Sequence, residues 1–144
     1  MRVVVDTNVW VAAVRSRRGA SFALLSEIPH RRFRFGLSVA LFLEYQEQLL
    51  KAVKTQATPL NIRQVEQILA ALAHYGAEVP IYYRLRPNLG DENDNMVFEC
   101  AANFGASVIV THNVRHFINP ELQGYAMDIM EPGAFLTRIK ETLA

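Results

Sequence analysis

The chain has 144 residues, 51% of them hydrophobic and 20% charged, which is typical of a globular protein, and we expect one domain over residues 1–144. Its formal net charge of +1 excludes a generic polyanion binder, so any nucleic-acid contact needs a local basic patch. The single cysteine, Cys100, excludes an intrachain disulfide and is typical of the reducing cytoplasm, and we expect neither a membrane span nor a signal peptide.

Apolar runs and helix start and stop signals predict strands that alternate with helices. The β-branched run Val3–Val5 is typical of a strand buried on both faces, and Ser38 is a good helix N-cap. In chain order the expected elements are strand 2–5, helix 7–14, helix 20–28 closed by Pro29, strand 33–37, a helix from Ser38 to Lys54, a helix from Thr58-Pro59 to Gly76, strand 77–81, a functional loop 82–92, helix 94–104 ended by Gly105, strand 107–110, strand 126–130 and a helix from Pro132. This alternation predicts a three-layer α/β/α fold around a parallel sheet.

Two acidic residues stand out in the first half of the chain. Asp6 follows a buried strand, where parallel sheets hold their ligands, although an Asp there also serves as the N-cap of a following helix. Glu44 lies well inside an apolar helix, and its helical neighbours include no basic residue. A carboxylate in that setting needs a cation from elsewhere in the fold. The alternative is a solvated glutamate at the edge of the helix.

Three polar residues are candidates in the second half. Asp91 and Asp94 belong to an Asp-Glu-Asn-Asp tetrapeptide at a helix start, where an acid either caps the helix or turns toward a site. Asn113 follows the buried strand 107–110. It reaches the same sheet edge as Asp6 if the two strands are neighbours, and it is otherwise the cap of a short turn over 114–117.

Carboxylates that converge on one edge repel one another, and a hard divalent cation relieves that repulsion. The candidate ligands Asp6, Glu44, Asp91 and Asp94 are all oxygen donors, with no cysteine and no clear histidine pair beside them. Such a donor set favours Mg²⁺ or Mn²⁺ over zinc. A cation of this kind polarises a phosphoryl oxygen and activates a water, so phosphodiester hydrolysis is the predicted reaction.

Four stretches together resemble PIN-domain ribonucleases, of the kind found as VapC-like toxins of bacterial toxin–antitoxin systems. They are Val4–Val9, Glu44 in the helix after Ser38, Asp91–Ala101 and Ile109–Asn113. The resemblance spans essentially the whole chain. It implies a twisted parallel sheet flanked by helices, a Mg²⁺- or Mn²⁺-dependent endonuclease with single-stranded RNA as substrate, a cognate antitoxin as partner, and a homodimer.

The same resemblance implies roles for individual residues. The first, second and third acids of the family motif match Asp6, Glu44 and Asp94, and Asp91 matches an additional acid of this branch. The chain departs from the pattern at Asn113, where many relatives have Asp. An amide brings no charge, so metal affinity is expected to be lower. This departure keeps open the alternative of a catalytically degenerate PIN domain that binds RNA or an antitoxin without cutting.

Basic, aromatic and apolar groups complete the expectations. The arginine groups are solvated surface or RNA-phosphate contacts: Arg15, Arg17 and Arg18; Arg31, Arg32 and Arg34; Arg84 and Arg86; and Arg115. We expect His112 and His116 on the surface or on phosphates, and Tyr82 and Tyr83 to pack rather than to stack on bases. The candidates for a partner surface are Phe42, Leu49, Leu50 and Val53, and Trp10, Cys100 and Phe104 are expected in the core.

Three other classes do not fit the residues present. A haloacid-dehalogenase-type phosphatase needs a second Asp where this chain has Asn8. A phospho-accepting receiver domain needs an acid pair at the first strand and a Lys after a late strand, and the chain has neither. A Rossmann cofactor domain needs a glycine-rich turn, and none follows Val5.

Overall fold

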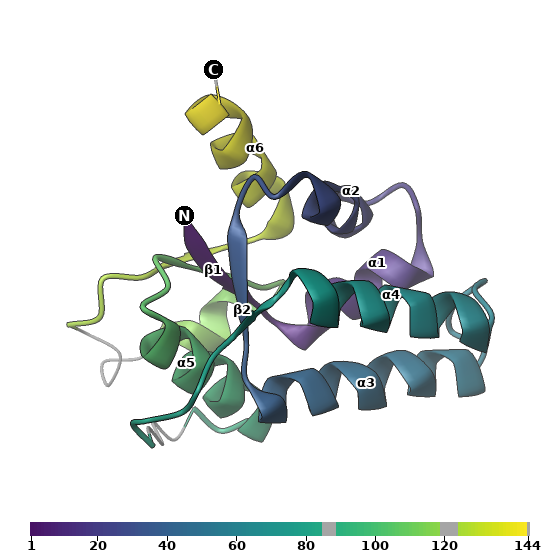
Figure 1. Cartoon of the computed structure of the whole chain (residues 1–144), viewed down its shortest axis with the longest axis horizontal. Helices are drawn as coiled ribbons and strands as arrows, with labels where there is room; N and C mark the ends of the chain where they lie inside the picture. The colour runs from purple at the N-terminus through teal and green to yellow at the C-terminus, as the bar shows by residue number, and fades with distance from the viewer. Residues whose placement is uncertain (85–88, 119–123, 144) are drawn as a thin grey trace.

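A computed structural model describes residues 1–84, 89–118 and 124–143 and shows strands alternating with helices (Figure 1). The strands are β1 (Arg2–Val5), β2 (Arg34–Leu37), β3 (Ala77–Glu78), β4 (Val108–Val110) and β5 (Asp128–Met130). The helices are α1 (Thr7–Arg15), α2 (Ala20–Glu27), α3 (Val39–Lys54), α4 (Ile62–Tyr75), α5 (Glu92–Phe104) and α6 (Pro132–Leu143), with 3₁₀ helices η1 (Ile28–His30) and η2 (Val114–Phe117). Over these residues, no helix combines the length and the apolar character needed to cross a membrane.

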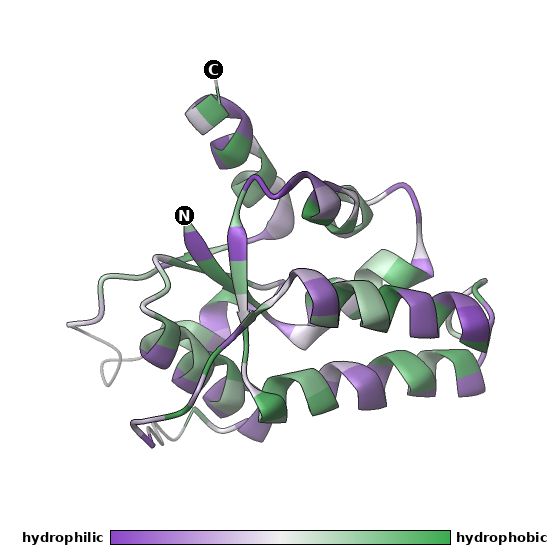
Figure 2. Ribbon diagram, viewed as in Figure 1, coloured by the Kyte–Doolittle hydropathy of each residue, from purple (hydrophilic) through white to green (hydrophobic). Residues whose placement is uncertain are grey.

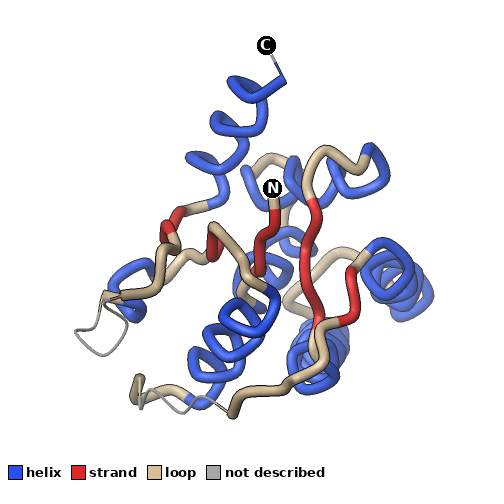
Figure 3. Tube along the Cα trace, turned by 60° about the vertical axis from the view of Figure 1, so that its left-hand side comes forward, coloured by secondary structure: helices blue, strands red, loops and turns tan. Residues whose placement is uncertain are grey.

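The strands form one parallel sheet with the order β3-β2-β1-β4-β5 (Figure 3). β1 and β4 are neighbours, with Val3 opposite Val108 and Val5 opposite Val110, as their β-branched apolar sequences predict. Helices flank the sheet, and α5 packs against β1, β2 and β4. The predicted α/β architecture with a central parallel sheet is therefore confirmed.

A cluster of large buried side chains lies under the carboxyl end of β1. Trp10 of α1 meets Tyr45 of α3 edge-on, with ring centroids 6.5 Å apart, and both are fully buried. The Tyr45 hydroxyl donates a hydrogen bond to the Val5 carbonyl. These contacts hold α1 and α3 against the end of the strand, directly before Asp6. The predicted core positions of Trp10, Cys100 and Phe104 are confirmed, since all three are buried.

Several element boundaries differ from the sequence prediction. α4 begins at Ile62, not at Thr58-Pro59, because Asn61 and Gln64 form a reciprocal capping box. The Thr58 hydroxyl donates to the Val14 carbonyl and accepts from the Leu60 amide, so this threonine joins a turn to α1. The predicted strand 77–81 is limited to Ala77–Glu78, and α2 ends at Glu27 with η1 following it. Part of the predicted loop, 85–88, lies outside the described residues.

Two surface expectations were wrong. Leu49 is not available to a partner, because α3 packs on α1, α4 and α5 and buries it completely. Phe42, Leu50 and Val53 are half-buried against the same core, on α3, along which hydrophobic and hydrophilic residues alternate (Figure 2). Tyr82 and Tyr83 do not pack either, since they are 79% and 71% exposed.

Candidate active site

The carboxyl ends of β1 and β4 bring two polar side chains together at one edge of the sheet. The Asp6 amide donates to the Val110 carbonyl at 2.8 Å, which continues the pairing of the two strands. The Thr111 hydroxyl then donates to Asp6 Oδ2 at 2.7 Å, and both residues are fully buried. Asp6 and the Thr-His-Asn segment therefore lie at the same edge, as strand adjacency predicts.

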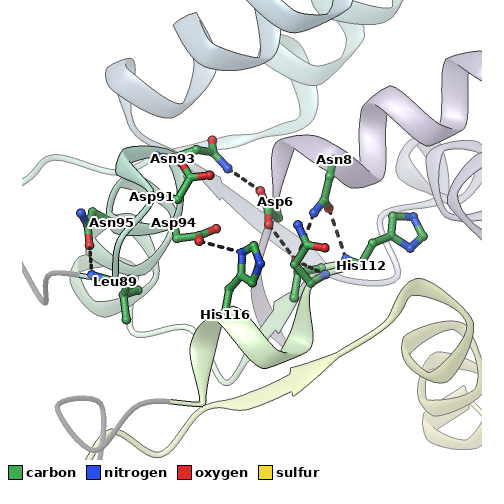
Figure 4. Close-up of polar contacts among 11 residues, drawn as sticks. Asp6, Asn8, Leu89, Asp91, Asn93, Asp94, Asn95, His112 and His116 are labelled. Atoms are coloured by element: carbon green, nitrogen blue, oxygen red, sulfur yellow. Dashed lines mark hydrogen bonds and ion pairs between the residues drawn. The ribbon is translucent and has the colours of Figure 1, made fainter.

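The Asp6 carboxylate is directed to α5 and not to the helix that follows it in sequence. Asp6 occupies the N-cap position of α1, but its side chain makes no capping hydrogen bond. Its Oδ1 instead accepts a 2.8 Å hydrogen bond from Asn93 Nδ2 (Figure 4). Asp6 is therefore the N-cap residue of α1 by position, while its carboxylate is hydrogen-bonded to the start of α5.

Asn93 connects three parts of the site. Besides bonding Asp6, its Oδ1 accepts from the Thr7 hydroxyl at 3.0 Å. Its amide donates to Asp91 Oδ1 at 2.9 Å, the contact by which Asp91 caps α5. Sequence reasoning did not single out Asn93. The available signal was its place inside the acidic tetrapeptide, where one side chain can serve the helix start and another can serve the site.

Asp94 is the second buried acid, with 2% of its surface exposed. Its Oδ2 lies 2.9 Å from Nδ1 of His116, which reaches across from η2 (Figure 4). His116 was expected on the surface or on phosphates, and its contact with a candidate ligand was missed. The histidine is separated from Asp94 by 22 positions, so only the fold brings the two together.

The acids gather around a polar pocket of about 610 Å³. Among the sequence-predicted residues, Glu44, Asp91, Asp94 and Asn113 line it. Asp6 is buried beside it and is bonded to Asn93, another lining residue. The remaining lining residues are Thr7, Asn8, Val11, Ala12, Arg15, Gln48 and His112. Asn113 is the N-cap residue of η2 by position, as the turn-cap alternative expects, although its side chain makes no capping hydrogen bond.

The carboxylates influence one another electrostatically. Burial raises the pKa of Asp6, and the hydrogen bonds from Thr111 and Asn93 oppose that rise. Burial also raises the pKa of Asp94, and the negative charge of Asp6 adds to the effect. The pKa of Glu44 is raised by burial first and then by the charge of Glu47, with smaller contributions from Asp91 and Asp6. Neutralising these carboxyl groups or supplying a cation would relieve the cost.

The carboxylates of the site are hydrogen-bonded to different neighbours and do not converge on one point. Among the described residues, no three His, Cys, Asp or Glu side chains meet closely enough to hold a metal ion together. Each acid has a different neighbour: Asp6 has Asn93 and Thr111, Asp94 has His116, and Asp91 has the amide that it caps. The donor set is oxygen-rich, as a hard cation requires, and it lies around one pocket.

The predicted basic groups differ in their relation to this pocket. Arg15, at the end of α1, lines it. The second group lies at or just before the start of β2, at the amino ends of the parallel strands, and consists of Arg31, Arg32 and Arg34. There Arg31 stacks on an aromatic ring and Arg32 pairs with a glutamate. Arg86 lies outside the described residues. The site therefore has one arginine of the first group at its edge and none of the second.

Comparison with known proteins identifies the family. The family model for the PIN domain matches residues 2–115. The chain belongs to the PIN domain family. No curated protein matches it in sequence.

Solved structures share the PIN fold at low identity. VapBC-1 from nontypeable Haemophilus influenzae is 17% identical with a TM-score of 0.58, over 92% of this chain and 99% of that one. VapBC2 from Rickettsia felis, in a crystal structure bound to a DNA fragment from their promoter, is 19% identical with a TM-score of 0.59, over 91% and 98%. At these sequence identities, the structural similarity shows that the chains share a fold and nothing more.

The raised carboxyl pKa values predict how stability depends on pH in the metal-free PIN domain. An acid with a raised pKa binds protons more readily when folded than when unfolded, so the free energy of unfolding falls as pH rises through that pKa. The wild type should therefore lose stability relative to Asp6→Asn as pH rises above 3.8, the ordinary pKa of the carboxyl group, because the variant lacks one such group. Urea unfolding of both proteins in chelator measures this difference, and a constant difference across the range would contradict the assignment.

Proposed function

We propose that this PIN domain is a Mg²⁺- or Mn²⁺-dependent endoribonuclease that hydrolyses single-stranded RNA, and that it is the toxin of a toxin–antitoxin pair. The observation that carries the proposal is the buried Asp6 at the sheet edge, with Glu44, Asp91 and Asp94 around the adjoining pocket. Burial raises the pKa values of Asp6, Glu44 and Asp94, and neighbouring negative charges add to the rise for Glu44 and Asp94, so the site would gain from a cation. Membership of the PIN domain family supports the same reading.

The four carboxylates would hold the metal. Their oxygens are hard ligands, and no cysteine or lysine lies among the residues that line the pocket. When bound, a divalent cation supplies Lewis-acid activation of the phosphate and of the attacking water. Asp6 and Asp94 are buried, so they are desolvated before any ligand arrives and bind a cation more strongly than exposed acids would.

The chain's own residues position the substrate and the water. Asp94 is held through Oδ2 by His116, and its second oxygen, which has no hydrogen bond to a described residue, would orient the attacking water; Asp91 is the alternative for that role. Arg15 lies at the pocket edge and would bind the RNA backbone. In-line attack expels the 3′-oxygen of the preceding nucleotide, so the products carry 5′-phosphate ends.

The partner would be a cognate antitoxin, as in the VapBC complexes that share this fold. An apolar pocket of about 340 Å³ between α2, η1 and α4 provides a surface for an apolar segment of such a protein. Its apolar lining residues are Phe22, Leu25, Ile28, Pro29, Leu60, Ile68 and Ala71. A homodimer remains part of the proposal, and the burial of Leu49 moves its interface away from the core side of α3.

Cleavage by the purified protein tests the proposed function. The protein is incubated with a single-stranded RNA in chelator, and then with Mg²⁺ or Mn²⁺ in excess. We expect cleavage only with metal, and products that a 5′-phosphate-dependent exonuclease degrades. Cleavage that continues in chelator would refute the metal-dependent mechanism.

One observation favours a second candidate, a catalytically degenerate PIN domain that binds RNA or an antitoxin. Within the part of the chain that the structure describes, the carboxylates do not form a three-ligand metal cluster, and an uncharged Asn113 lines the pocket beside them. RNA binding without cleavage at millimolar metal would favour this candidate.

Asn113→Asp distinguishes a weakened metal ligand from a substrate contact. The change adds a negative charge at the pocket edge, so it should raise the cleavage rate at limiting metal, by about tenfold if it acts as strongly as an outer-shell partner of a metal ligand. At saturating metal the two proteins should converge. Initial rates across a Mg²⁺ titration measure this, and a variant with equal or lower rates at limiting metal would place Asn113 on the substrate or its water.

A further inference from the structure

A second polar pocket, of about 530 Å³, adjoins the candidate active site. The two pockets share His112 and Asn113 in their linings. The second pocket is completed by Val114, Arg115, His116 and Glu131. A molecule that extends from the acids past Asn113 would therefore enter this second pocket.

The two pockets differ in formal charge, since the first is negative and the second has one arginine and one glutamate. Three of the candidate metal ligands line the first. The second has the guanidinium of Arg115 and the two imidazoles, and Glu131 is the one carboxylate among its lining residues. Arg115 is exposed and has no ion pair among the described residues, so its charge is available to a ligand. Such a guanidinium is suited to phosphate oxygens.

The boundary between the pockets is held in place by hydrogen bonds from three elements. His112 Nε2 lies 2.8 Å from the hydroxyl of the buried Ser21 in α2, and the His112 amide donates to Asn8 Oδ1 of α1 at 3.2 Å. The Asn113 amide donates to the Thr111 hydroxyl at 3.0 Å. The position of the second pocket relative to the acids is thus fixed by the fold before a substrate binds, which lowers the ordering cost of binding.

We propose that the second pocket is a phosphate subsite for the nucleotide next to the scissile bond, with Arg115 as its charged contact. This inference rests on the proposed function. A single-stranded RNA carries one phosphate per nucleotide, so the phosphate beside the scissile one must lie near the acids. Placing it against Arg115 offsets the repulsion that it would otherwise meet there. The subsite makes the substrate an oligonucleotide and excludes a mononucleotide.

Salt-dependent binding of fluorescein-labelled octauridylate in chelator tests the subsite through Arg115→Gln. Loss of one phosphate contact should weaken binding at low salt and reduce the slope of log K against log salt by about 0.7, the value for single strands. The matched control is Arg34→Gln, an exposed arginine that begins β2 at the opposite edge of the sheet. It should change neither quantity. Thermal unfolding establishes that both variants are folded.

For a second variant we expect binding to change in the opposite direction. Glu131→Gln removes the carboxylate from the pocket and should strengthen octauridylate binding, whereas Glu66→Gln on the exposed side of α4 should not. An unchanged salt slope in Arg115→Gln, equal losses in the two arginine variants, or no binding by the wild type would overturn the subsite. Because the assay requires no cleavage, a protein that binds through Arg115 and never cuts would refute the nuclease and keep the subsite.

Discussion

Asp6→Asn is expected to reduce metal-dependent RNA cleavage by more than about 100-fold, since loss of a mere outer-shell partner of a metal ligand already costs about 10- to 100-fold. Asp6 is the most buried of the candidate ligands and stands at the sheet edge where β1 and β4 meet. The substitution keeps the size of the side chain and its contact with Thr111, and it removes the charge and the acceptor oxygen that faces Asn93. Initial rates on a single-stranded RNA at saturating Mn²⁺ measure the loss.

Glu47→Gln is the matched control for this experiment. Glu47 lies on the exposed side of α3, one turn from Glu44, and it does not line the pocket. Its loss should leave the rate within about threefold, an effect of the size expected for a surface charge. Equal losses in the two variants, or cleavage that survives Asp6→Ala, would remove Asp6 from the mechanism and favour the binding-only PIN domain.

Addition of Mg²⁺ or Mn²⁺ is expected to raise the melting temperature of the wild type on the order of 5–10 °C. A ligand at 100 times its Kd stabilises the folded state by about 2.7 kcal/mol, and each kcal/mol shifts the melting temperature by a few degrees in a chain of this size. The gain is specific to the folded state, because only folding brings Asp6, Glu44 and Asp94 near one another. Calorimetry in chelator and at millimolar metal measures the shift.

Two variants are compared with the wild type in that experiment. Asp6→Asn should lose most of the metal-induced shift, and Glu47→Gln should retain it, since Glu47 lies outside the pocket. Monovalent salt at matched ionic strength separates specific binding from screening of exposed charges. A melting temperature that does not respond to millimolar Mg²⁺ or Mn²⁺ would count against the metal site, independently of any assay with RNA.

The loss of cleavage in Asp6→Asn and the metal-induced rise in melting temperature have one physical origin. Buried carboxylates with raised pKa values destabilise the metal-free fold at neutral pH, and a bound cation relieves that cost. Asp6→Asn should therefore lose cleavage while losing little stability without metal. Such a variant separates loss of function from loss of folding, which a core substitution such as Leu49→Ala would confuse.

The sequence by itself determined the elements and the edge at which the site lies. Local patterns sufficed for β1, α3 after its Ser38 cap and α5 before Gly105, because periodicity, capping and β-branched runs act over a few residues. The adjacency of β1 and β4 followed from their being the most apolar, β-branched runs, which a parallel sheet places at its centre. The same patterns placed the α4 start wrongly. Two helix signals lay close together, and the Thr58 side chain is used in a contact with Val14, 44 residues away.

Only the tertiary structure decided how each site residue is bonded. The partners of Asp6 are Asn93 and Thr111, at separations of 87 and 105 residues. A hydrogen bond depends on distance and direction in space, and a local sequence pattern specifies neither across such separations. The same holds for His116 on Asp94, for the burial of Leu49 and for the exposure of Tyr82. The residue types in the sequence identified the acidic candidates, and the packing of the fold decided which neighbour each of them contacts.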